Sequence, residues 1–261
     1  MSLTCTTKGS MNLMSVILVA ACVLLATGNA VFAEPYLQLD ANPATYVDGL
    51  FFGEVESIVT TDRSFTLYAL VNSDQGSTDG YFYLSGAVVP SIYPRLTPDP
   101  DLGFFTFDGA TINVTSNMEY GTPPMEVLSE NKDLPGHGIF ETYYFEHEFT
   151  LDLDDPDKRA LVYNSQDTQN GPFVASTVDP DGDLYFEDFE VDISGLVDSE
   201  FYSLHFDLYT QVWDEKKEAY VLGDKAPFSH DLTATHAPVP GAVLLGMLGL
   251  GVAGVKLRKF A

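Results

Sequence analysis

The sequence predicts an all-β fold, an antiparallel β-sandwich, for residues 34–237. The first observation is that apolar, β-branched and aromatic residues recur there in runs of strand length. The second is that clusters of Pro, Gly and Asp separate these runs. The third is that no stretch of about ten residues shows clean helical periodicity with caps. Many short strands joined by such turns are typical of a sandwich, with either jelly-roll or immunoglobulin-like topology.

The expected strands follow one another along this part of the chain. The run 65–71 is rich in β-branched and aromatic residues and ends at an Asn-Ser-Asp cluster. The run 81–89 begins after an Asp-Gly pair and ends at Pro90. The same reasoning predicts the later strands, which are 111–116, 139–153, 184–193, 202–210 and 219–222.

Two of these runs alternate, which predicts the face on which each side chain lies. In the run 184–193 the residues expected on one face are Tyr185, Glu187, Phe189, Val191 and Ile193. In the run 202–210 the residues expected to face the core are Leu204, Phe206 and Leu208. Because successive side chains point to opposite faces of a strand, His205 and Asp207 are expected together on the other face.

Charge limits the classes of partner. The chain carries a formal net charge of −26. All acidic residues lie within 34–237, whereas Lys8 and three basic residues near the C-terminus lie outside it, so this part is more negative still. Such a surface repels nucleic acid and anionic lipid, so no nucleic-acid partner is expected. Divalent cations, cationic polymers or high salt suit it, and simple solubility explains the charge equally well.

Residues 1–33 have the three regions of a secretory signal peptide. Lys8 lies in a polar leader, the stretch 13–26 is almost continuously apolar, and small residues precede Glu34 at the −3 and −1 positions. A lipoprotein box ending at Cys22 is a second interpretation, but the apolar run continues past it. The signal predicts export through an N-terminal helix. Both cysteines of the chain lie inside it, so the exported domain, 34–237, has no disulfide.

Residues 238–261 have three parts in a fixed order. They open with a turn motif made of Pro238, Val239, Pro240 and Gly241. No charged residue occurs from Ala237 to Val255, which corresponds to about 28 Å of helix. A basic tip follows and predicts that this end of a transmembrane helix stays in the cytoplasm.

This order resembles the PEP-CTERM sorting signal of Gram-negative bacteria, which an exosortase cleaves. Val239 stands where the plain form of that motif has Glu. The resemblance implies an exosortase-type partner and an inner-membrane intermediate held through 242–255, followed by placement at the cell surface or in an extracellular matrix. A buried core helix is the alternative, and its four glycines, each costing about 1 kcal/mol in a soluble helix, count against it.

Asp179, Asp181 and Asp183 form the best metal candidate in the sequence. Carboxylates at alternate positions of a tight loop can converge on one hard cation such as Ca²⁺. The spacing also fits the first positions of an EF-hand loop, but Leu184 occupies the sixth position, where that loop requires Gly. A calcium loop of looser form and a solvated acidic turn both remain consistent with these residues.

The histidines suggest a second cluster. His137 lies between two glycines, His205 shares a strand face with Asp207, and His230 precedes Asp231 in another segment. If the fold brings His137, His205 and His230 together, they organise the loops at one end of the sandwich. Hydrogen bonding between loops is the first explanation of such a cluster, and a Zn²⁺ site is the other.

The sequence carries no catalytic signature. It lacks a Gly-x-Ser-x-Gly elbow, an HExxH motif, a phosphate loop and a dinucleotide fingerprint. Pairs of acidic residues suitable for a glycosidase arise by chance in so acidic a chain. We therefore expect a protein that is not an enzyme, with Ca²⁺ as the first cofactor candidate.

Three segments resemble one family, the choice-of-anchor N proteins. They are Leu134–Phe140, Leu204–Tyr209 and Ala226–Asp231, and the openings Tyr36–Leu39 and Phe65–Tyr68 agree with them. The resemblance implies an exported domain joined to interchangeable C-terminal sorting tails, with no catalytic activity. We expect a structural or adhesive protein of the cell surface or matrix. The alternative is a secreted glycan-binding or carbohydrate-active protein that contacts extracellular polysaccharide.

Overall fold

The computed structural model describes most of residues 35–235. The described ranges are 35–47, 57–90, 102–124, 128, 141–161, 163–166, 172–174, 178–196, 202–227 and 230–235. The expected signal peptide, the sorting motif with its transmembrane helix, and His137 all lie outside them. Within the described ranges, no helix has the length and apolar character needed to cross a membrane.

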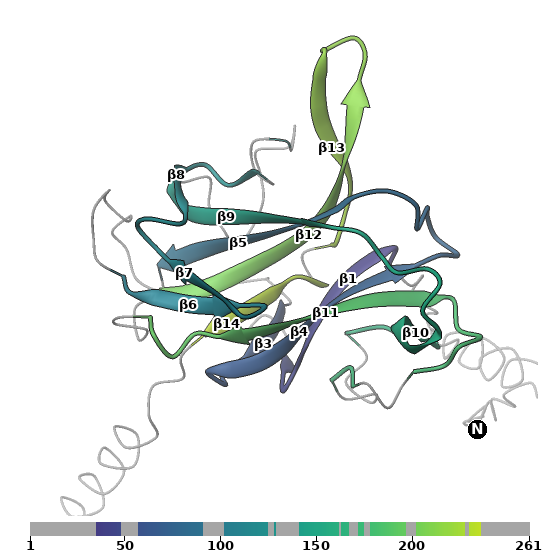
Figure 1. Ribbon diagram of the computed structural model, residues 1–261, viewed down its shortest axis with the longest axis horizontal. Helices are drawn as coiled ribbons and strands as arrows, with labels where there is room; N and C mark the ends of the chain where they lie inside the picture. Colours follow the sequence, from purple (N-terminus) through teal and green to yellow (C-terminus); the bar gives the residue numbers. More distant parts are fainter. Residues whose placement is uncertain are drawn as a thin grey trace, which may run out of the picture. The chain divides into compact units, whose positions relative to one another are not determined.

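One sheet is antiparallel throughout and is called sheet A here (Figure 1). Its strands, in spatial order, are β1 (Leu37–Asn42), β4 (Ser64–Asn72), β11 (Leu184–Asp192), β6 (Phe104–Phe107) and β7 (Ala110–Asn113). The short strand β10 (Arg159–Ala160) also pairs with β11, directly after the 3-10 turn η1 (Pro156–Lys158). Sheet A thus joins the first described strand to one from the last third of the chain.

The second sheet, called sheet B, is mixed. Its strands, in spatial order, are β2 (Thr45–Val47), β3 (Ser57–Thr60), β14 (Leu232–Thr235), β12 (Tyr202–Asp214), β5 (Phe82–Pro90), β9 (Thr142–Phe149) and β8 (Glu119–Gly121). The strand β13 (Ala219–Lys225) pairs with β12 off this path. The pairing of β14 with β3 is parallel, and the others are antiparallel. The prediction of an all-β fold is therefore confirmed.

The two sheets share one apolar core. Leu67 and Phe189 enter it from sheet A, and Leu84 and Phe206 enter it from sheet B. The ring of Phe107 on sheet A lies 6.5 Å from that of Phe206, measured between centroids. Each large apolar side chain buried in this way contributes about 1.5–3 kcal/mol to stability.

A second, smaller core covers part of the outer face of sheet A. Phe186 of β11 packs there edge-on against Phe173, with ring centroids 5.0 Å apart, and Tyr68 and Tyr163 join them. The alternation predicted for 184–193 placed Phe186 opposite Phe189, and the structure agrees. Phe186 is buried as well because a segment from elsewhere in the chain packs over its face.

The strands expected at 65–71, 81–89, 184–193, 202–210 and 219–222 are present as β4, β5, β11, β12 and β13. The expected strand 139–153 is shorter, since β9 spans Thr142–Phe149. In place of 111–116 the chain forms β7 and, before it, the unpredicted β6. A two-residue turn joins them, with φ of 47° at Asp108 and 75° at Gly109, as a type I′ hairpin requires.

Candidate functional site

A buried polar cluster lies on the outer face of sheet B. His205 and Asp207 project from β12 away from the shared core, while Leu204, Phe206 and Leu208 fill that core. The expected division of this strand into two faces is therefore confirmed. His205 is nonetheless only 6 % exposed, so other parts of the chain cover it. Burial of charged groups is costly, which makes this cluster unusual.

Asp231, the residue just before β14, completes the cluster. The His205 Nε2 atom lies 3.6 Å from Asp207 Oδ1 and 3.5 Å from Asp231 Oδ2. All three ligand atoms lie within 4.8 Å of one another. The other ring nitrogen, Nδ1, is 2.8 Å from the Thr233 hydroxyl on the neighbouring strand. The ring is thus held at one nitrogen by Thr233 and presents the other to two carboxylates.

Neighbouring strands position the backbone of both aspartates. Asp207 pairs across the sheet with Ser85 of β5, and the backbone carbonyl of Asp231 accepts a hydrogen bond of 3.3 Å from the Ile58 N–H. Ser85 is fully buried, and within the described residues its hydroxyl has no hydrogen-bond partner. The site therefore contains a buried hydroxyl beside the buried carboxylate of Asp207.

The charges of the cluster depend on one another. Burial alone lowers the pKa of His205, but the carboxylates of Asp231 and Asp207 outweigh it and raise the pKa to about 10. Burial also lowers the pKa of Lys225, and the Asp207 carboxylate partly offsets that change. A positive charge on the imidazole therefore counters the two carboxylates when no cation is bound.

His230 forms a hydrogen bond with Asn164, in another part of the chain. Its Nε2 atom lies 3.0 Å from the Asn164 side-chain oxygen, so this nitrogen donates the hydrogen bond. Burial lowers the pKa of His230 to about 4, and the ring is therefore neutral at ordinary pH. His230 thereby links the segment that precedes β14 to the chain around Asn164.

The expected cluster was His137, His205, Asp207 and His230. The structure brings His205 together with Asp207, engages His230 with Asn164, and does not describe His137. Asp231, a possible hydrogen-bond partner of the expected cluster, belongs to the buried group, as does Ser85, which was not expected. The adjacency of His230 and Asp231 in sequence was a signal for Asp231, whereas Ser85 becomes recognisable only from strand pairing.

Hydrogen bonds within the aspartate loop and to Ser73 hold the loop in place. Asp179 Oδ1 accepts a hydrogen bond of 2.9 Å from the Asp181 N–H, and its carbonyl accepts one of 3.0 Å from Gly182. The carbonyl of Asp183 accepts hydrogen bonds from the Ser73 N–H and hydroxyl.

Among the described residues, the group of three possible metal ligands whose atoms lie within 4.8 Å of one another is His205, Asp207 and Asp231. The loop carboxylates are not part of it, and their calcium binding stays a prediction.

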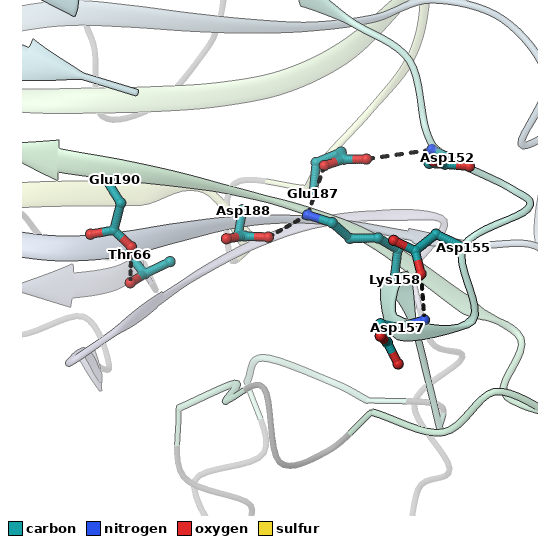
Figure 2. Close-up of polar contacts among 8 residues, drawn as sticks. All are labelled: Thr66, Asp152, Asp155, Asp157, Lys158, Glu187, Asp188 and Glu190. Atoms are coloured by element: carbon teal, nitrogen blue, oxygen red, sulfur yellow. Dashed lines mark hydrogen bonds and ion pairs between the residues drawn. The ribbon is translucent and has the colours of Figure 1, made fainter. Parts of the chain in front are cut away.

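A second charged arrangement lies on sheet A, where Lys158 reaches two acidic residues of β11 (Figure 2). Its Nζ atom is 3.0 Å from Glu187 Oε2 and also bonds Asp188. Glu187 in turn accepts a hydrogen bond from the Asp152 N–H. These side chains are partly exposed, so the contacts neutralise local charge and form no enclosed site.

A cavity of about 520 Å³ opens near β8 and β9. Glu119 and Glu146 line it, and each accepts a hydrogen bond from a tyrosine, Tyr144 and Tyr209 respectively. Burial and Glu146 together raise the pKa of Tyr209, so its hydroxyl stays protonated and donates. The two carboxylates thus serve as acceptors for neighbouring side chains.

No family model, no curated protein and no solved structure matches this chain. The buried cluster itself combines one imidazole with two buried carboxylates.

Proposed function

We propose that the chain is an exported β-sandwich module of the bacterial cell surface or extracellular matrix, structural or adhesive in role, which an exosortase-type system sorts and cleaves. The observation that carries this proposal is the order of the C-terminal segment: the Pro238–Gly241 motif, the uncharged stretch and the basic tip. A signal-peptide pattern at the other end, residues 1–33, supports the same route.

The body of the molecule suits this role. Two sheets around one core give an all-β domain of the kind common among surface modules, and we propose that they are the layers of the sandwich, between a signal helix and a transmembrane helix. Residues 34–237 contain no cysteine, so the domain relies on its core and polar contacts rather than on disulfides. The resemblance to choice-of-anchor N proteins also supports an exported domain with a separable tail.

Intact-mass measurement tests the sorting proposal. In a Gram-negative host that has the sortase, the exported protein should end near Pro240. The double variant Pro238→Ala/Pro240→Ala should instead keep its full C-terminus and accumulate in the inner membrane. Pro227→Ala, which changes a proline outside the motif, is the matched control and should be processed normally. Full-length wild-type protein retained in the inner membrane would contradict the proposal.

Glycan binding is the second candidate, and an exposed aromatic pair favours it. Trp213 and Tyr220 are 54 % and 57 % exposed on the β12–β13 hairpin, which extends past the other strands of sheet B (Figure 1). Their rings meet edge-on at 73°, with centroids 5.2 Å apart, so a sugar can stack on one ring at a time. If the hairpin binds glycan, Trp213→Ala should abolish retardation of the protein in polysaccharide-containing native gels. Tyr81→Ala, at an exposed tyrosine elsewhere, should leave it unchanged.

A further inference from the structure

We propose that His205, Asp207 and Asp231 bind one divalent transition-metal ion of the zinc type. This proposal is independent of the sorting route, since it concerns only the exported domain. It rests on the geometry of the three ligand atoms, on the burial of two carboxylates, and on an unsatisfied hydroxyl beside them.

The distances fit a shared ion. Zinc binds imidazole nitrogen and carboxylate oxygen at about 2.0–2.2 Å, usually with tetrahedral geometry. Neighbouring ligand atoms on such an ion lie about 3.3–3.6 Å apart. The His205 Nε2 atom is 3.6 Å from the Asp207 oxygen and 3.5 Å from the Asp231 oxygen. Both separations from Nε2 therefore match one shared ion, and the two carboxylate oxygens lie within 4.8 Å of each other.

The burial of the two aspartates gives an electrostatic reason for a cation to bind here. Asp207 and Asp231 are 6 % and 2 % exposed, and two carboxylates removed from water require compensating positive charge. A proton on His205 and the ammonium group of Lys225 provide some of that charge. A divalent ion provides more of it, at the point where all three ligand atoms converge. The ion and the proton compete for the same nitrogen, so they exclude each other.

The surroundings of the cluster resemble those of a zinc ligand set. A histidine ligand usually donates its second ring N–H to an oxygen, which fixes the ring orientation. The contact of 2.8 Å between His205 Nδ1 and the Thr233 hydroxyl suits this arrangement. Three protein ligands leave a position for water, and a bound water can satisfy the buried Ser85 hydroxyl, which lacks a partner within the described residues.

The ligand types identify the class of ion. Ca²⁺ and Mg²⁺ prefer ligand sets made of oxygen atoms, whereas imidazole nitrogen favours zinc and its neighbours. This separates the cluster from the Asp179–Asp183 loop, which offers oxygen only. Asp231 precedes β14 and the other two ligands lie on β12, so an ion here would link two segments of sheet B in a domain that has no disulfide.

Zinc titration tests the proposal. The exported protein, stripped with chelator and dialysed into metal-free buffer, should bind one zinc ion per chain in competition with a chromophoric chelator. Asp207→Asn and Asp231→Asn should each weaken binding by about 100-fold or more, because each removes a ligand but preserves side-chain volume. Asp181→Ala, an acidic residue of the other loop, is the matched control and should bind zinc like the wild type. Circular dichroism should show that each variant is folded.

A cobalt measurement keeps the proposal testable if the Asn variants do not fold. Co²⁺ bound to the wild type should give the visible absorption of a four-coordinate site, and one equivalent of Zn²⁺ should remove it. Wild-type protein that binds neither ion would overturn the proposal. Folded Asp207→Asn and Asp231→Asn variants with undiminished zinc affinity would overturn it too, as would loss of zinc binding in Asp181→Ala.

Discussion

Asp40 shows how a single buried carboxylate joins two parts of the chain. Its Oδ2 atom accepts hydrogen bonds from the Tyr163 hydroxyl at 2.6 Å and the Phe173 N–H at 2.8 Å, and its Oδ1 accepts one from the Ala41 N–H at 2.7 Å. Burial raises the pKa of Asp40 to about 6, although these hydrogen bonds act to lower it. The folded chain therefore holds this proton more tightly than the unfolded chain does.

The sign of the resulting pH dependence follows by linkage. Between the unfolded pKa of about 3.9 and the folded value of about 6, the folded state binds more protons, so its stability falls as the pH rises. The contribution is on the order of 3 kcal/mol, present at about pH 4 and lost above about pH 6. Asp40→Asn cannot titrate. The variant should thus gain about 3 kcal/mol relative to the wild type between pH 4 and pH 7, measured by urea unfolding. A difference that stays constant with pH would contradict this prediction.

At the scale of elements, the turn before β11 is held by close backbone contact. Gly182 lies against the end of β10, where an added Cβ would be 1.8 Å from the carbonyl oxygen of Ala160 and 2.2 Å from its carbon. The Arg159 side chain donates a hydrogen bond of 3.0 Å to the Gly182 carbonyl. Because the contacting atoms are backbone, a side chain at this position requires β10 and the turn to separate.

Gly182→Ala should therefore lower the free energy of unfolding by about 3 kcal/mol, at the upper end of typical overpacking costs. Gly121→Ala is the matched control, because the nearest atom to its added Cβ is a tyrosine side-chain carbon at 3.9 Å. It should change stability by less than about 0.5 kcal/mol. Urea unfolding of the two variants makes the comparison, and equal midpoints would show that the β10–β11 contact yields freely.

The turn before β11 is also the candidate calcium-binding loop, Asp179–Asp183. Asp179 and Asp183 make hydrogen bonds that close the turn and tie it to Ser73, so the loop is ordered by its own contacts. The Asp179 carboxylate is arranged by a backbone hydrogen bond, whereas Asp183 contributes its main-chain carbonyl, so the loop carboxylates can remain solvated. Calcium binding there is accordingly a separate matter from the zinc proposal, and Asp181→Ala distinguishes the two.

For the molecule as a whole, net charge should dominate the response to salt. The chain carries −26 formal charges, and like charges repel in the compact state. Raising NaCl from about 0.01 M to about 1 M shortens the screening length from about 30 Å to about 3 Å. The unfolding temperature, measured by circular dichroism, should rise by several degrees as a result.

A reducing agent should leave the unfolding temperature unchanged, since residues 34–237 contain no cysteine. A fall in unfolding temperature with salt would mean that favourable ion pairs such as Lys158–Glu187 dominate instead.

The pattern of apolar and polar residues along the chain was sufficient to predict much of the fold. The strict alternation around Leu204 and Phe206 predicted which face of β12 meets the core, because the period of a strand is a property of neighbouring residues. The same alternation placed His205 beside Asp207. The short strands β1, β2, β3, β6, β8, β10 and β14 were not predicted, since two to six residues carry little periodicity. The Asp108–Gly109 pair was a usable signal for the β6–β7 hairpin.

The sequence by itself therefore determined the all-β class, the main strands, the faces of β12 and the absence of a disulfide from residues 34–237. Only the tertiary structure decided that Asp231 meets His205, that Ser85 lies buried opposite Asp207, and that Asp40 binds Tyr163. Each of these contacts joins residues at least 26 positions apart in the sequence. Strand pairing and burial create such contacts, and neither leaves a periodic signal in the residues that take part.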